Sequence, residues 1–160
     1  MKNIVMARID DRLLHGQVVV SWIPFLKAEE IIVIDDESFN DEFMKELILT
    51  SAPEGIKIHV FSLEQSINYL KESSGSERVL ILVNKIRCIK ELLDNQIQIN
   101  IVNLGGLGHS NERKRYLNFI HLSDDELSLL KDIEKMPNCN LEIQMIPNDR
   151  KYSLAELYKN

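Results

Sequence analysis

Short apolar and β-branched runs alternate along the chain with segments in which apolar residues recur every three or four positions. Such runs are typical of β-strands, and such segments are typical of amphipathic helices. This alternation predicts an α/β fold with a mainly parallel sheet, right-handed crossover connections and helices on both faces. The predicted strands span residues 4–9, 31–34, 56–61, 78–83, 97–102 and 141–146, and the predicted helices span residues 16–26, 41–50, 63–73 and 86–95.

The regular alternation of predicted strands and helices changes after Gly105 and Gly106. Residues 116–122 predict an extra strand, for which an antiparallel orientation is the hypothesis. Ser123 is a good N-cap for a helix over residues 124–135. Only short turns join the predicted elements, so the 160 residues are interpreted as a single domain spanning 1–160.

The amino-acid composition and net charge exclude some classes of function. Hydrophobic residues make up 44% of the chain, which is enough to build a core. The formal charge of −6 argues against a nucleic-acid partner. Cys88 and Cys139 lie far apart without the spacing of a zinc site or a disulfide framework, so no metal or cofactor is expected.

The apolar runs are much shorter than the roughly 20 residues that cross a bilayer. The first residues also lack the apolar core and cleavage site of a secretory signal. These features predict a soluble protein of the cytoplasm.

The densest polar cluster, RIDDRLLHGQ at residues 8–17, stands where the first predicted strand ends and the first predicted helix begins. Parallel sheets bind ligands at the carboxyl ends of their strands, and the free N–H groups of a helix start favour phosphate. Because a neutral imidazole can act as a nucleophile, His15 is the candidate nucleophile. Arg12 is the candidate phosphate contact. Asp10 or Asp11 would orient the ring or the arginine.

The same residues also have a purely structural interpretation. Arg8 and Asp11 could form a surface ion pair worth under about 1 kcal/mol. A single histidine near a helix start is often structural or simply exposed. Residue chemistry alone leaves both interpretations open.

The run RIDDRLLHGQV at residues 8–18 resembles the active-site signature of the IIB subunits of the bacterial sugar phosphotransferase system, mannose/fructose/sorbose family. The family sequence RIDDRLIHGQV surrounds a phosphorylated histidine, and Leu14 is the only difference. The similarity continues through residues 31–36, 40–41, 52–53, 103–106 and 142–147, and so covers essentially the whole chain. It implies an open α/β sheet of about seven strands.

The resemblance implies a phosphocarrier. A phosphorylated IIA partner would donate a phosphoryl group to His15, and His15 would pass it to a sugar presented by the membrane subunits IIC and IID. The protein would then associate peripherally with the transporter at the inner face of the membrane, and a homo-oligomer is a further hypothesis. The site assigned in this way consists of His15, Arg12 and Asp10 as catalytic residues and of Arg8, Asp11, Gly16 and Gln17 as phosphate- or loop-binding residues.

Three segments depart from the family pattern. Residues 84–86 replace a more usual Lys-Asn-Pro-like stretch, Pro24 stands near the end of the first predicted helix, and residues 109–115 are only loosely similar. None of them contains the nucleophile. The sequence does not indicate which sugar is the acceptor, because specificity is expected to reside in the membrane subunits.

Two other functions compete with the phosphocarrier. Asp10 and Asp11 after an apolar strand are faintly similar to a Mg²⁺-dependent aspartyl-phosphate phosphatase, although Arg12 stands where the second acid belongs. A non-catalytic α/β regulatory binding module would keep the fold, but it should have lost His15. Residues 35–37 resemble a Mg²⁺ site only weakly and are interpreted as a cap for the helix at 41–50.

Overall fold

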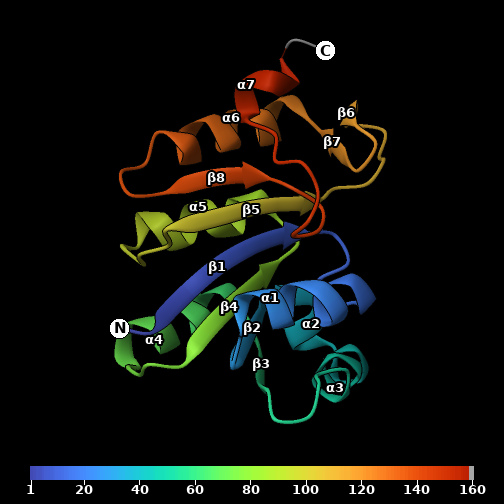
Figure 1. Ribbon diagram of the computed structural model, residues 1–160. Helices are drawn as coiled ribbons and strands as arrows, with labels where there is room; N and C mark the ends of the chain where they lie inside the picture. The colour runs from blue at the N-terminus through green and yellow to red at the C-terminus, as the bar shows by residue number, and fades with distance from the viewer. Residues whose placement is uncertain (159–160) are drawn as a thin grey trace.

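The computed structural model describes residues 1–158 and contains a six-stranded, all-parallel sheet at its centre (Figure 1). The strand order is β3-β2-β4-β1-β5-β8, and β6 and β7 form a separate antiparallel pair. The predicted α/β fold, with its mainly parallel sheet, is therefore confirmed. The strands are β1 (Asn3–Asp10), β2 (Glu30–Ile34), β3 (Lys57–Phe61), β4 (Arg78–Val83), β5 (Ile101–Gly106), β6 (Lys114–Leu117), β7 (Ile120–Leu122) and β8 (Asn140–Ile143).

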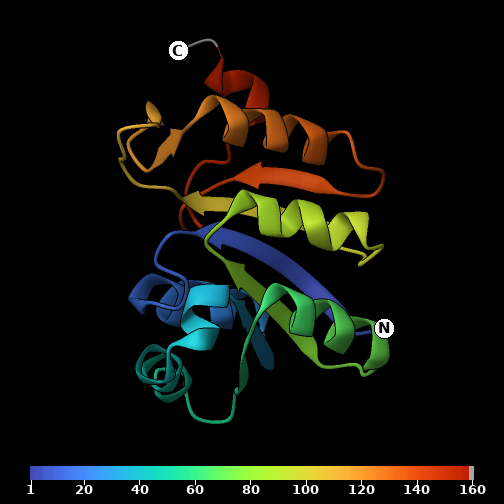
Figure 2. The ribbon, with the colours of Figure 1, turned by 180° about the vertical axis from the view of Figure 1, so that it is seen from behind.

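Helices cover both faces of the sheet. One core cluster joins the sheet to η1, α1 and α3, and a second joins it to α4, α5, α6 and α7. Figure 1 shows α1 in front of the sheet, and the reverse view in Figure 2 shows α4 and α5 in front of it. The helices are η1 (Val18–Trp22), α1 (Ile23–Leu26), α2 (Asp36–Asn40), α3 (Glu42–Thr50), α4 (Leu63–Glu72), α5 (Ile86–Asp94), α6 (Asp124–Glu134) and α7 (Leu154–Leu157).

The carboxyl end of β1 lies at a topological switch point. β1 runs between β4 and β5 and is buried along most of its length. The chain leaves β1 toward the face covered by η1 and α1, whereas it leaves β4 toward the opposite face, where α5 packs. Ligands of open parallel sheets bind where connections diverge in this way.

Several predicted boundaries are wrong. The strand predicted at residues 116–122 is a hairpin of β6 and β7 that turns at Asn118 and Phe119. The strand predicted at 97–102 begins only at Ile101, because Ile97 and Ile99 are buried in the preceding connection. Apolar residues in a buried loop give the same sequence signal as residues in a strand.

The region predicted as one helix over residues 41–50 contains two helices. Asp35 accepts a hydrogen bond from the Ser38 amide and caps α2, whereas Asp41 accepts from the amides of Phe43 and Met44 and caps α3. Asp35 therefore caps α2 and not the helix at 41–50. Ser123 caps α6 through a capping box, as its sequence position predicts.

The first helical segment is irregular. Its central part, η1, is a π-helix, and α1 follows with Pro24 in its first turn. A π-helical stretch accommodates the missing N–H of a proline, since it widens the turn before it. Phe25 is 62% exposed, while Trp22 is 1% exposed. A spacing of three residues is typical of two side chains on one face of a helix, but only Trp22 of this pair faces the core.

Within residues 1–158, no helix is both long enough and apolar enough to cross a membrane.

Candidate functional site

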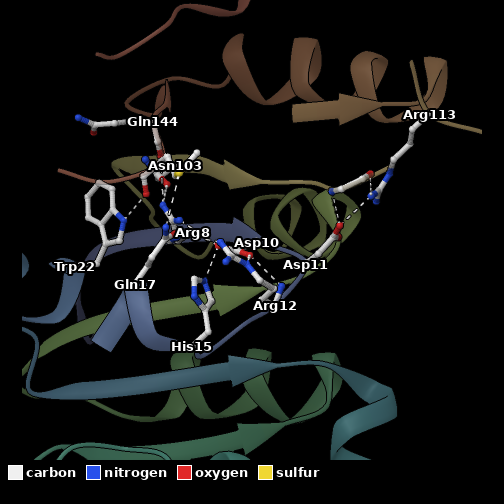
Figure 3. A network of polar contacts seen from close by, with 12 residues as sticks. Arg8, Asp10, Asp11, Arg12, His15, Gln17, Trp22, Asn103, Arg113 and Gln144 are labelled. Atoms are coloured by element: carbon white, nitrogen blue, oxygen red, sulfur yellow. Dashed lines mark hydrogen bonds and ion pairs between the residues drawn. The ribbon is translucent and has the colours of Figure 1, made fainter. Parts of the chain in front are cut away.

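Asp10 ends β1 and is the centre of a polar network at the switch point (Figure 3). Its Oδ1 atom accepts a hydrogen bond of 2.9 Å from the backbone N–H of Arg12. Its Oδ2 atom lies 3.1 Å from Nη2 of Arg8 and 2.9 Å from Nε2 of His15. The chain reverses at Leu13, whose φ of 55° is left-handed, and this reversal returns His15 toward the end of its own strand.

The Asp10 carboxylate stays charged although it is 1% exposed. Burial raises the pKa of this carboxyl, whereas the hydrogen bonds from the Arg12 amide and from His15 lower it. The charge of Arg8 lowers it further, and the resulting pKa lies below the usual value. Asp10 is therefore an acceptor at neutral pH.

His15 approaches the site through one ring nitrogen. A carboxylate only accepts hydrogen bonds, so the nitrogen that faces Asp10, Nε2, carries the proton. In a neutral ring Nδ1 then keeps its lone pair, and no hydrogen bond to Nδ1 is found within residues 1–158. The side chain is 14% exposed. The arrangement leaves Nδ1 available as a nucleophile.

Arg12 and Gln17 lie at the edge of an open depression of about 320 Å³. The Arg12 side chain is 54% exposed, and its Nη2 atom donates a hydrogen bond of 3.2 Å to Gln17. Its Nε atom also lies 3.4 Å from Oδ1 of the buried Asp10, so the exposed end of the guanidinium can approach an anion while Nε keeps this contact. The depression is lined by Asp10, Asp11, Arg12, Gln17, Gly106, Leu107, Gly108, Phe119 and Met145.

Gly16 stands at the start of the helical segment. A Cβ atom built at this position would meet no other atom within 4 Å. The backbone here is therefore open to a ligand, and helix-start N–H groups favour anions.

Arg8 and Asp11 do not pair with each other. Arg8 is fully buried and donates to Asp10, whereas Asp11 accepts hydrogen bonds from the Gly108 amide at 2.7 Å and from Arg113 at 3.1 Å. The interpretation of Arg8 and Asp11 as a surface ion pair is wrong. Alternation along a strand explains the outcome, because residues 8 and 10 share a face of the sheet and residue 11 has left the strand.

Four residues that the sequence did not assign to the site belong to the network around Arg8. Asn103 Oδ1 accepts a hydrogen bond of 2.7 Å from Arg8, and the backbone carbonyl of Gln144 accepts one of 3.3 Å. The Trp22 ring lies 5.1 Å from the Arg8 guanidinium and donates through its indole N–H to the Met145 carbonyl. The available sequence signal was the polar Asn103 inside an apolar strand.

Comparison with solved structures places this fold in one class. The crystal structure of manxB from Thermoanaerobacter tengcongensis superposes with a TM-score of 0.90 at 35% identity, covering 99% of this chain and 96% of that one. The IIBSor domain of the sorbose permease from Klebsiella pneumoniae superposes with a TM-score of 0.89 at 28% identity, covering 98% and 97%. The fold is that of a phosphotransferase-system IIB domain.

The family assignment follows from the sequence as a whole. The model of the PTS system sorbose subfamily IIB component matches residues 4–160, and the chain belongs to this family. The mannose-specific EIIAB component of Escherichia coli (strain K12) is 29% identical over 95% of this chain and 47% of its own length. The predicted membership of the IIB family is thus confirmed, and the chain is a phosphotransferase component of sugar uptake.

Proposed function

We propose that His15 carries a phosphoryl group on Nδ1, accepting it from a phosphorylated IIA partner and passing it to a sugar. The contact of 2.9 Å between Asp10 Oδ2 and His15 Nε2 carries this proposal. It holds the proton on Nε2 and directs the lone pair of the ring to Nδ1.

In the first transfer, the lone pair of His15 Nδ1 attacks phosphorus in line with the bond to the donor nitrogen. That bond breaks, and its electron pair returns to the donor ring. Positive charge develops on the His15 ring and is stabilised by the Asp10 carboxylate.

In the second transfer, a sugar hydroxyl oxygen attacks the phosphorus and its proton passes to water. The bond between phosphorus and Nδ1 breaks, and its electron pair returns to the His15 ring. Arg12 is positioned to neutralise the equatorial oxygens of the phosphoryl group in both steps, since its side chain is exposed beside the loop. The backbone at Gly16 and Gln17 would add N–H contacts.

The partners follow from the family. Relatives with the name EIIAB contain a second part beyond the matched 47%, which supports a IIA donor for this chain. The membrane subunits IIC and IID would present the sugar, and the protein would work at the inner face of the membrane. The relatives are named for different sugars, sorbose and mannose, so their names do not identify the sugar that this chain serves.

The geometry does not favour an aspartyl-phosphate phosphatase. Such an enzyme needs a carboxylate oxygen free to attack phosphorus, whereas both oxygens of Asp10 are occupied by hydrogen bonds and Asp10 is buried. Asp11 accepts from Gly108 and Arg113 through a single oxygen and faces away from His15 (Figure 3).

Incubation with phosphorylated IIA, followed by mapping of the labelled residue, tests the proposal. Label on His15 that is acid-labile and alkali-stable is the expected result. Label that hydroxylamine removes and that depends on Mg²⁺ would instead indicate an aspartyl phosphate.

A further inference from the structure

Arg8 is a buried cation in the middle of the sheet. Its side chain is 0% exposed, and its hydrogen bonds go to Asp10 on its own strand, to Asn103 on β5 and to the Gln144 carbonyl after β8. A side chain enclosed in this way does not reach a phosphoryl group on His15. Any role of Arg8 in transfer must therefore pass through the groups it touches.

A buried ion pair such as that of Arg8 and Asp10 is weak evidence for a contribution to stability. Taking a guanidinium and a carboxylate out of water is costly, and apolar side chains of similar volume are often as good or better. Two polar atoms of the cluster, Arg8 Nε and Asn103 Nδ2, also lack a hydrogen-bond partner within residues 1–158. Buried polar groups with unmet hydrogen bonds need an explanation, and they concentrate at functional sites.

The surroundings of Arg8 hold its guanidinium in one place. A Cβ atom at position 105 would overlap the guanidinium of Arg8, so Gly105 provides the space that it occupies. The Trp22 ring lies 5.1 Å from the guanidinium carbon. Asn103 Oδ1 makes the shortest hydrogen bond to Arg8, at 2.7 Å.

These contacts form a continuous chain that ends at the proposed nucleophile. Asn103 accepts from Nη1 of Arg8, and Nη2 of Arg8 donates to Oδ2 of Asp10 at 3.1 Å. The same Oδ2 atom pairs with Nε2 of His15 at 2.9 Å. A movement of Arg8 therefore changes the position of the one oxygen that orients the His15 ring.

We propose that Asn103 is a positioning residue for phosphoryl transfer, acting through Arg8 and Asp10 to hold His15 with its proton on Nε2. An amide suits this role because it accepts a hydrogen bond from Arg8 without a charge that would compete with Asp10. The inference rests on the proposed phosphorylation of His15.

The test compares Asn103→Leu with the wild-type protein. Leucine has a similar volume but no acceptor, so Arg8 loses its shortest hydrogen bond. We expect the ¹⁵N chemical shifts of His15 to change from mainly the Nε2–H tautomer to a mixture. We also expect the single-turnover rate at saturating phosphorylated IIA to fall about tenfold, with the half-saturating IIA concentration unchanged, since the Asn103 side chain is fully buried and does not contact a donor.

Asn95→Leu is the matched control. The Asn95 side chain likewise makes one hydrogen bond, which it donates to the Glu91 carbonyl at 2.8 Å, but it lies at the end of α5. This variant should lose stability and leave the His15 tautomer unchanged. Arg8→Lys keeps the charge but replaces the planar guanidinium fork with a single nitrogen, which loses the geometry that joins Asn103 to Asp10, so it should resemble Asn103→Leu.

A folded Asn103→Leu protein with the wild-type tautomer and a rate within about twofold of wild type would overturn the inference. The tautomer is measured without a phosphoryl donor, so it remains decisive if wild-type His15 proves not to accept phosphate. Absence of label in the wild-type protein would overturn the proposed function and not the positioning of the ring.

Discussion

Arg113 Nη1 donates a hydrogen bond of 3.1 Å to Oδ2 of Asp11, although 102 residues separate them. The same guanidinium also donates to both carboxylate oxygens of Glu126 at 2.9 Å. Through these hydrogen bonds, Arg113 links the loop that carries His15 to the start of α6. Residues 109–115, which depart from the family pattern, thus contact the site through Arg113.

We expect Arg113→Ala to loosen this loop. The free energy of unfolding should fall by on the order of 1 kcal/mol, because the pairs are partly exposed. The Gly108 amide, which donates to Asp11, should exchange faster with deuterium. Amide exchange measured by NMR checks this, with Arg150→Ala as a control for loss of an exposed arginine that pairs with Glu156. An unchanged exchange rate at the Gly108 amide would contradict the expectation that Arg113 holds this loop in place.

We expect His15→Ala to abolish labelling by phosphorylated IIA while the fold survives, because the side chain lies at the surface end of the network. His109→Ala, which removes an exposed histidine from the loop after β5, should label normally. The amount of labelled protein after a fixed incubation is the measurement. Full labelling of His15→Ala would refute the assignment of His15 as the phosphorylated residue.

We expect Arg12→Ala to slow transfer by roughly tenfold to a thousandfold, the range of a single electrostatic stabiliser. Lys71→Ala removes an exposed cation in the last turn of α4 and should have no effect. Single-turnover rates from phosphorylated IIA distinguish the two variants. An Arg12→Ala rate equal to wild type would refute a phosphate contact.

We expect IIA to dock over residues 8–17 and the neighbouring strand ends, since the phosphoryl group must pass in line between two histidines. The border should include residues 103–108 and Lys85, which pairs with Asp35 at 3.6 Å. A carrier must release each partner, so the affinity should be micromolar or weaker. Amide shift perturbation on titration with IIA is the test. If the amide shifts of residues 73–76 change and those of the His15 loop do not, IIA docks on a different face.

We expect His59 to weaken the fold as the pH falls. Burial lowers the pKa of His59, although the nearby carboxylate of Glu30 at 3.2 Å opposes this shift. A buried neutral histidine contributes stability above its unfolded pKa of about 6.5. This contribution is lost as the pH decreases from there toward the lower folded pKa, because the unfolded chain binds the proton first.

The comparison of His59→Phe with wild type tests this expectation. Phenylalanine can keep the stacking of position 59 on Phe61 but does not titrate. The urea midpoint of the variant should change less between pH 7 and pH 5 than that of wild type. An equal change in both proteins would mean that His59 makes no contribution.

Much of the fold was readable from local sequence. The alternation of apolar runs and helical periodicity predicted the parallel α/β architecture, and Ser123 predicted the start of α6. Such signals depend on neighbours along the chain. They failed at Ile97 and Ile99, where buried residues of a connection gave the sequence signal of a strand, and in the first helical segment, where they did not reveal the π-helix.

For the site, the sequence by itself determined the place of His15 and Arg12 in a loop after the first strand. Apart from the family resemblance, the residue chemistry left both Asp10 and Asp11 open as the partner of the ring. Only the tertiary structure made that choice, because the strand order places Asn103 and the Gln144 carbonyl beside Arg8, which then pairs with Asp10. These groups lie 95 and 136 residues from Arg8, and no local propensity connects residues that meet only when the sheet assembles.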